Sequence, residues 1–323
     1  MNWTLIIFSL IAAMIPMVSY LVVIWRLDRY DREPIWLVSL NFIWGAFGAI
    51  ILGLVVGSFF ERSFISVIFN PQNKDTLNSL LTAPLIEELA KGVFLIFITA
   101  PQKDFDNMTD GIVYGAAIGL GFGMTENFLY FLNIGTIKEW IIIVSMRSIL
   151  SAVMHACSTA TFGAFVGYSK FQLSKNKNLF ILAGLLTAII IHFIWNFFVI
   201  IDYNKFIFIG IGFIFIAVVI IVVLFQWSLS VESKLITKEL MDESNTGLIP
   251  AEHINYLPYT HLRNSTEWFP DNNKRLRYIK IATTLTFRKQ QYKNCSPSEK
   301  AFYEKEIEEF REEIVHILNG TPI

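Results

Sequence analysis

The sequence is short of charged residues. Only 16% of its 323 residues are Asp, Glu, Lys or Arg, whereas 54% are hydrophobic and 15% are aromatic. Because soluble globular domains carry about 25% charged residues, this composition excludes an ordinary soluble protein. About half of the charged residues follow Ser230. The chain is therefore expected to combine a membrane-embedded body with a polar tail.

Cysteine is scarce, and the familiar hydrolase motifs are missing. Cys157 lies within an apolar run and Cys295 in the polar tail, so a disulfide between them is not expected. The sequence has no HExxH, no GxSxG, no glycine-rich phosphate loop and no catalytic Cys–His spacing. These absences exclude the enzyme classes that such motifs mark.

The sequence contains several long apolar runs. A spanning helix needs about 20 apolar residues to cross about 30 Å of hydrocarbon. Runs of this length cover residues 3–25, 35–60, 77–98, 111–132, 140–168, 179–201 and 206–228. The first run has no basic segment before it and no clear cleavage site after it, so it is interpreted as a retained helix. We expect an all-α, polytopic membrane bundle of about seven helices over residues 1–229.

Basic residues in the connections indicate the orientation, because Lys and Arg near helix ends tend to remain cytoplasmic. The first, third and fifth connections contain Arg26, Arg29, Arg32, Lys103, Lys170, Lys175 and Lys177, and the other three contain Arg62, Lys74, Lys138 and Lys205. The N-terminus is therefore expected outside the cell and the tail in the cytoplasm, with the bundle in the plasma membrane.

Residues 230–323 are expected to form this cytoplasmic tail, with a helical hairpin. Ser296, Pro297 and Glu299 have the pattern of a capping box at the start of a helix. An apolar stripe follows at helical spacing: Tyr303, Ile307, Phe310, Ile314 and Ile317. A second helix over about residues 274–292 would pair with it, and its basic stretch suits either anionic lipid headgroups or a solvated face. Nothing in the tail resembles a catalytic motif.

Polar and ionisable side chains recur inside four of the apolar runs. They are Glu87, Glu88 and Lys91 in the third, Glu126 in the fourth, Arg147 and His155 in the fifth, and His192 and Asn196 in the sixth. A charge at the centre of a spanning helix costs about 2.5–3.5 kcal/mol on insertion scales, so several together indicate a site. Counting at 1.5 Å per residue places the acids and imidazoles of four helices in one slab about 10 Å thick.

Spacing along each helix leaves some roles open. Lys91 can pair with Glu88 three residues before it, so a structural ion pair is as good an account of Glu88 as catalysis. Asn196 shares a helix face with His192 and suits either interhelical hydrogen bonding or catalysis. Arg147 lies about two turns outward of His155 and is interpreted as snorkelling to the interface.

Glycines recur every four residues in the fourth run. They are Gly111, Gly115, Gly119 and Gly123. Such a seam of small residues allows a neighbouring helix to approach closely just before Glu126.

Four motifs, in this order, resemble the motif set of the PrsW family of intramembrane proteases. They are EELAK at 87–91, FGMTE at 122–126, HACST at 155–159 and HFIWN at 192–196, and the loop DRYDREPIW at 28–36 is similar to a further family signature. The related CAAX prenyl endopeptidases have His where this chain has Glu126. The resemblance implies site-1 cleavage of a single-pass membrane protein at its extracytoplasmic side, an anti-sigma factor in the family's best-known case.

Peptide hydrolysis needs a base for water, donors for the oxyanion and an acid for the leaving amine. The residues expected to supply them are Glu87, Glu88, Glu126, His155, His192 and Asn196. One hypothesis has Glu126, His155 and His192 holding a catalytic zinc ion, with Glu87 as the base. The other needs no metal: Glu87 and Glu126 activate water, while His192 and Asn196 form the oxyanion hole.

Two functions other than proteolysis stay open on these residues. A proton-coupled transporter also keeps Glu and His near the membrane midplane. A non-catalytic scaffold would use the tail to recruit cytosolic proteins. No internal repeat pairs the two halves of the chain, which favours the protease. The expected partners are a single-pass membrane protein substrate and membrane lipid, with no nucleic acid.

Overall fold

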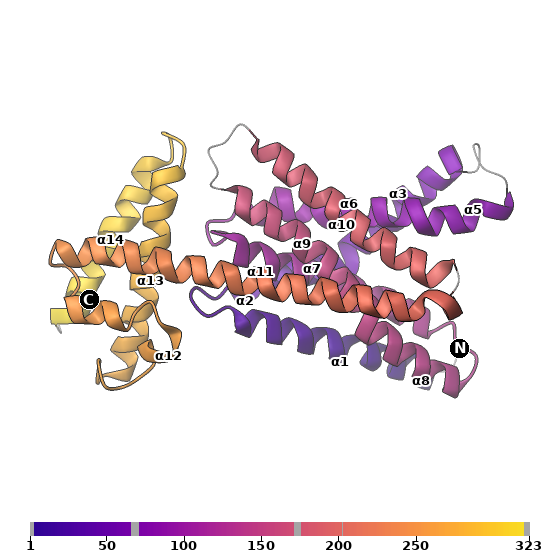
Figure 1. Ribbon diagram of the computed structural model, residues 1–323, viewed down its shortest axis with the longest axis horizontal. Helices are drawn as coiled ribbons and strands as arrows, with labels where there is room; N and C mark the ends of the chain where they lie inside the picture. Colours follow the sequence, from indigo (N-terminus) through magenta and orange to yellow (C-terminus); the bar gives the residue numbers. More distant parts are fainter. Residues whose placement is uncertain (1–2, 66–70, 171–175, 202, 320–323) are drawn as a thin grey trace. The chain divides into compact units, whose positions relative to one another are not determined.

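The regular structure of the chain is helical throughout the part that the structure describes, which is residues 3–65, 71–170, 176–201 and 203–319 of a computed structural model (Figure 1). The expected all-α fold class is confirmed. Lys175, which contributed to the orientation argument, and the last four residues of the tail lie outside the described residues. The chain divides into two units: Met1–Leu27, Glu33–Lys170 and Ser174–Phe225 form the first, and Asp28–Arg32, Phe171–Leu173 and Gln226–Ile323 form the second.

The first unit is a bundle in which short π-helical segments, labelled η1 to η5, interrupt the α-helices. Its elements are α1 (Trp3–Leu27), α2 (Ile35–Ile43), η1 (Trp44–Ala49), α3 (Ile50–Phe60), η2 (Glu61–Ile65), α5 (Pro71–Leu77), η3 (Asn78–Thr82), α6 (Ala83–Phe94), η4 (Leu95–Thr99), α7 (Met108–Phe131), α8 (Ile137–Met146), η5 (Arg147–Ser151), α9 (Ala152–Lys170) and α10 (Lys177–Ile200). Each π-helical segment continues its neighbours, so residues 35–65, 71–99 and 137–170 form three long helices.

Among the described residues, five helices are long and apolar enough to cross a membrane. They are Trp3–Leu27, Ile35–Ser63, Ile137–Lys170, Lys177–Ile200 and Lys205–Asn245. The other two expected spans, 77–98 and 111–132, coincide with the helix at 71–99 and with α7. The first of these carries the charged residues of the candidate site, and α7 is rich in glycine. The protein is a multi-pass membrane protein, and the number of seven spans stays a prediction.

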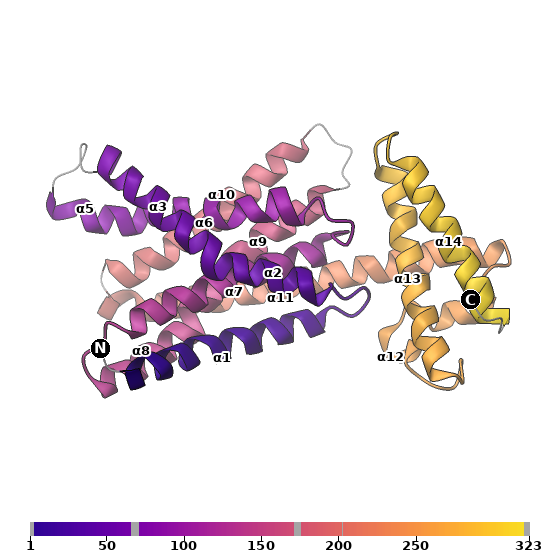
Figure 2. The same ribbon diagram turned by 180° about the vertical axis from the view of Figure 1, so that it is seen from behind.

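Helix α7 is the centre of the first unit. It packs against α1 on one side and α9 on the other (Figures 1 and 2), and most of its residues are buried. Its first turn is fixed by a capping box, in which Asn107 Oδ1 accepts the backbone N–H groups of Thr109 and Asp110, while Asp110 Oδ2 accepts that of Asn107 at 3.0 Å. The central position of α7 brings Glu126 to the inside of the bundle.

The glycine seam of α7 lies against α9, as the sequence indicates. A Cβ atom built at Gly111, Gly115 or Gly119 would lie 2.0–2.3 Å from a backbone carbonyl oxygen of α9, and at Gly119 that oxygen belongs to His155. The two helices therefore touch backbone to backbone. This contact places His155 directly beside α7.

The second unit contains the end of α11 (Tyr203–Asn245), the 3₁₀-helix η6 (Ala251–Asn255), α12 (Thr260–Arg263), α13 (Asn272–Asn294) and α14 (Lys300–Asn319). Helices α13 and α14 occupy the ranges in which the sequence indicates the tail hairpin, and they pack against each other. The stripe of α14 contributes Ile307, Ile314 and Ile317 to a buried apolar core that includes Tyr278 and Leu285 of α13.

A methyl group on the glycine seam should weaken the bundle. In Gly115→Ala the new Cβ meets the Thr159 carbonyl oxygen at 2.3 Å, so α7 and α9 must move apart, at a cost of about 1–3 kcal/mol. Gly212→Ala is the matched control, because nothing lies within 4 Å of a Cβ there. Thermal unfolding in mild detergent is expected to show a lower midpoint for Gly115→Ala only. An unchanged midpoint would contradict the packing described here.

Candidate active site

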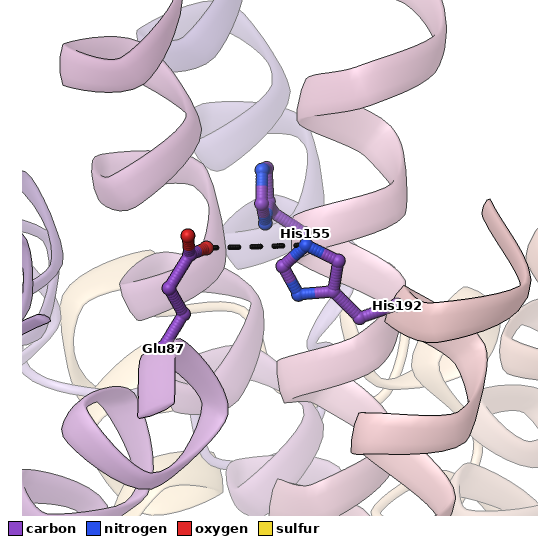
Figure 3. Close-up of side chains that lie close together, drawn as sticks. All are labelled: Glu87, His155 and His192. Atoms are coloured by element: carbon purple, nitrogen blue, oxygen red, sulfur yellow. Dashed lines mark ion pairs between the residues drawn. The ribbon is translucent and has the colours of Figure 1, made fainter. Parts of the chain in front are cut away.

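Four helices bring the acids and imidazoles of the sequence motifs together inside the first unit. Helix α6 supplies Glu87 and Glu88, α7 supplies Glu126, α9 supplies His155 and α10 supplies His192. Figure 3 shows the side chains of Glu87, His155 and His192 pointing toward one another. The shared depth inferred from the sequence is thus matched by contact across helices.

Glu88 is the most enclosed of the acids. Its side chain is 1% exposed and forms an ion pair with Lys91 at 2.8 Å. Ser158 Oγ donates to Glu88 Oε1 at 3.1 Å and Thr159 Oγ1 donates to Oε2 at 3.3 Å, both from the HACST motif. Buried charge is tolerated when it is paired and hydrogen-bonded in this way. Glu88 is therefore held as a carboxylate that joins α6 to α9.

His192 also contacts Glu88, through Nδ1 at 2.9 Å. A carboxylate only accepts hydrogen bonds, so Nδ1 carries the proton and Nε2 presents its lone pair. Nε2 lies 3.9 Å from Glu87 Oε2 (Figure 3). A carboxylate behind an imidazole is the arrangement that orients metal-binding histidines in proteins.

His155 is engaged through both ring nitrogens. Lys91 Nζ lies 3.0 Å from Nδ1, and Glu126 Oε2 lies 2.8 Å from Nε2. Because an ammonium group only donates, Nδ1 accepts from Lys91 and Nε2–H donates to Glu126. The His155 and His192 rings meet edge to face with centroids 4.8 Å apart.

Glu126 has a second hydrogen-bond partner, the cation Arg147, which the sequence pattern did not indicate. Arg147 donates to Glu126 Oε2 at 2.7 Å and to Asn127 Oδ1 at 3.0 Å, and its guanidinium lies over the Tyr130 ring. The interpretation of Arg147 as a snorkelling residue is therefore corrected. Its charge is used inside the bundle, because Glu126 is half-buried beside it and gains from a counter-charge.

Glu87 differs from the other acids. Its Oε2 atom is buried and has no hydrogen-bond partner among the described residues. One donor atom each from Glu87, His155 and His192 lie within 4.8 Å of one another. A carboxylate and two imidazoles are a common ligand set for catalytic zinc, so these three residues fit a metal ion. This set has Glu87 in the place that the sequence hypothesis gave to Glu126.

Asn196 points to a different part of the bundle. Its side-chain amide donates to the Ser79 carbonyl oxygen at 2.9 Å, which ties α10 to η3. The residue lies one turn after His192, as the motif indicates, but its observed contact is with backbone.

A cavity of about 300 Å³ adjoins the acids. Glu87 and Glu126 both line it, together with residues of α3, η3 and α6 that include Gly53, Gly57 and Thr82. The site therefore has space in which a reacting group can approach two carboxylates.

The fold and this site together define a membrane-embedded protein with a buried acid–imidazole centre beside a cavity. The family model described as "PrsW family intramembrane metalloprotease" matches residues 33–227. The chain belongs to this family. The four helix motifs fall within the matched range, and the loop signature at 28–36 falls within it from Glu33 onward.

Individual relatives agree with the family match. The chain is 28% identical over 194 residues to Protease PrsW of Bacillus subtilis (strain 168), which covers 59% of this chain and 82% of the relative. It is 28% identical over 193 residues to Protease PrsW of Clostridioides difficile (strain 630), covering 59% and 79%. It is 31% identical over 186 residues to Protease PrsW of Oceanobacillus iheyensis, covering 58% and 80%. No solved structure matches the chain significantly.

Removing the cation from the buried pair should destabilise the fold. Lys91→Met leaves Glu88 as a buried carboxylate without its ammonium partner, which costs about 3–5 kcal/mol. The double variant Glu88→Gln, Lys91→Met removes both charges and should regain much of this loss. Lys74→Met is the control, because its ion pair with Glu61 is partly exposed and worth about 0–1 kcal/mol. Thermal unfolding in detergent measures all three, and equal effects of Lys91→Met and Lys74→Met would contradict the assigned role.

Proposed function

We propose that the protein hydrolyses a peptide bond of a single-pass membrane protein within or beside the membrane. The observation that carries this proposal is the grouping of Glu87, His155 and His192 at a cavity that Glu126 also lines. Hydrolysis of an amide needs a proton acceptor for water and a polar environment for the developing oxyanion, and these residues can provide both.

Glu87, His155 and His192 are the residues that we propose would hold a metal ion. When bound there, a zinc ion would polarise the substrate carbonyl and lower the pKa of water. Glu88 keeps the proton of His192 on Nδ1, so that Nε2 is available as a ligand. To bind through Nε2, His155 would have to give up its Nε2–H hydrogen bond to Glu126, and its proton would have to move to Nδ1, which now accepts from Lys91.

Glu126 is then the residue that we assign to proton transfer. Arg147 and His155 hold one of its oxygens from two sides, and the side chain lines the cavity. In this position Glu126 can accept a proton from the attacking water and return it to the leaving amine. The metal-free alternative keeps Glu87 and Glu126 as the pair that activates water. For His192 and Asn196 to hold the oxyanion, His192 Nε2 would have to gain a proton and the Asn196 amide would have to leave the Ser79 carbonyl.

The proposed substrate is an anti-sigma-factor-like protein that is cut at its extracytoplasmic side. This part follows from the motif resemblance. We also propose that the bundle lies in the plasma membrane with its N-terminus outside and its tail in the cytoplasm, as the basic residues of the connections favour. A tag at the end of the tail should be protected from protease added to intact cells, and its digestion would reverse this orientation.

Glu87→Gln should abolish proteolysis while the protein still inserts and accumulates. The amide has the size of the carboxylate but neither its charge nor its basicity, so the variant fails both as a metal ligand and as a base. The measurement is co-expression with candidate single-pass proteins, followed by detection of a truncated product. Product that persists at the wild-type level in Glu87→Gln would exclude the proposed site and return the transporter and scaffold functions to consideration.

The zinc content of purified variants should show whether Glu87 or Glu126 is the metal ligand. If Glu87 is the ligand, purified Glu87→Gln loses bound zinc together with His155→Ala and His192→Ala, whereas Glu126→Gln retains zinc but loses cleavage. If Glu126→Gln loses zinc and Glu87→Gln retains it, the metal ligands are instead Glu126, His155 and His192. Full activity of a chelator-treated, zinc-free preparation would favour the metal-free mechanism.

A further inference from the structure

We infer that the cavity beside Glu87 binds one large apolar side chain of the substrate next to the bond that is cut, and that Gly53, Gly57 and Thr82 determine which substrates fit. This inference rests on the proposed function. It adds a substrate feature and the residues that recognise it.

The two glycines keep one wall of the cavity open. They lie four residues apart on α3 and therefore on the same helix face. A Cβ atom at Gly53 would lie 3.9 Å from Cγ of Glu87, and at Gly57 nothing lies within 4 Å. Helix packing thus does not require glycine at either position, unlike the seam of α7. Glycine is unfavourable inside helices, so the space itself is the feature that these residues provide.

The apolar part of the lining indicates an apolar occupant. Apolar side chains of α3, α6 and α7 face the cavity: Ile50, Leu54, Ile86, Phe122 and Leu129. Its volume of about 300 Å³ is at the lower end of the range for ligand pockets. It therefore suits one side chain with its adjoining backbone better than a longer segment.

Thr82 is one of the polar residues of the lining, which also include Ser58, Glu61, Asn78 and the two acids. The residue is 3% exposed, lines the cavity, and its Oγ1 atom has no hydrogen-bond partner among the described residues. Two other helical threonines of this bundle donate to the carbonyl four residues before: Thr161 to Cys157 at 2.8 Å and Thr187 to Ala183 at 2.8 Å. A buried hydroxyl without a partner is costly, so a ligand that binds it gains affinity once the Thr82 side chain turns its Oγ1 atom into the cavity. The peptide group of a substrate is such a ligand.

The position of the acids identifies this occupant as substrate rather than a lipid chain. Glu87 and Glu126 line the same cavity as Gly53 and Gly57. A side chain seated against α3 therefore brings its own peptide group to the carboxylates. A lipid tail would have no use for the Thr82 hydroxyl, and it would place no hydrolysable bond beside the acids.

Filling the cavity should change substrate preference. The probe is the single-pass protein whose truncated product defines activity, prepared with Ala, Val, Leu or Phe on either side of the cleaved bond. Gly57→Leu is expected to lower kcat/KM for the Leu and Phe substrates by about tenfold or more, and to leave the Ala substrate within about threefold of wild type. Gly212→Leu is the matched control, because a Cβ there also meets nothing within 4 Å but lies on α11, away from the cavity lining.

The Thr82 hydroxyl is tested with a pair of near-isosteric changes. Thr82→Val should raise KM and lower kcat/KM by about three- to tenfold, the value of one hydrogen bond, whereas Thr82→Ser should restore wild-type kinetics. The unfolding midpoint of Thr82→Val should not fall, because the hydroxyl makes no hydrogen bond with the described residues that could be lost.

The outcomes distinguish this inference from the proposed function. Wild-type cleavage with an unchanged preference in Gly57→Leu would overturn the inference and leave the protease intact. Uniform loss on every substrate, or release of co-purified lipid by Gly57→Leu without a shift in preference, would also overturn it. Absence of any cleavage by the wild-type protein, across the candidate substrates, would overturn both.

Discussion

The ion pair between Glu88 and Lys91 sets the hydrogen-bond directions of the whole site. Lys91 Nζ lies between Glu88 and the His155 ring, and an ammonium group only donates. His155 must therefore accept at Nδ1 and turn its Nε2–H toward Glu126. Glu88, held as a carboxylate, accepts the Nδ1–H of His192. One buried charge pair thus fixes the tautomers of two imidazoles on two other helices.

The helices and most residues of the candidate site can be predicted from the sequence, but the hydrogen bonds and ion pairs between helices cannot. Apolar runs and helical spacing were sufficient to find the helices and to place Glu87, Glu88, Glu126, His155 and His192 at one depth, because length and periodicity are local properties. Pairing across helices is not local. Arg147 and Glu126 are in contact although they are 21 residues apart in the sequence, and Ser158 and Glu88 are in contact although they are 70 residues apart. The position of Ser158 inside the HACST motif was the available signal for its role.

The contact between α7 and α9 explains why so precise a site can be built from helices alone. Side chains separate most helix pairs, and side chains can change rotamer. Here the glycine seam lets the backbone of α7 meet that of α9 at the level of His155. Interiors packed in this way transmit displacement instead of absorbing it. The imidazole on α9 and the carboxylate on α7 consequently keep their separation.

The π-helical segments have a consequence for changes in chain length. Such segments hold one more residue per turn than an α-helix does, and η5 (Arg147–Ser151) lies between Arg147 and His155. Deleting a single residue there would convert the wide turn to ordinary helix, and because the wide turn had accommodated the extra residue, Arg147 would keep nearly its present direction relative to His155. The same holds for η3 (Asn78–Thr82), which precedes Glu87 and Glu88. A one-residue deletion in these two turns would therefore leave the acids and their counter-charge in place, whereas the same deletion in the α-helical part of α6 or α9 would rotate the residues before it by about 100° relative to those after it.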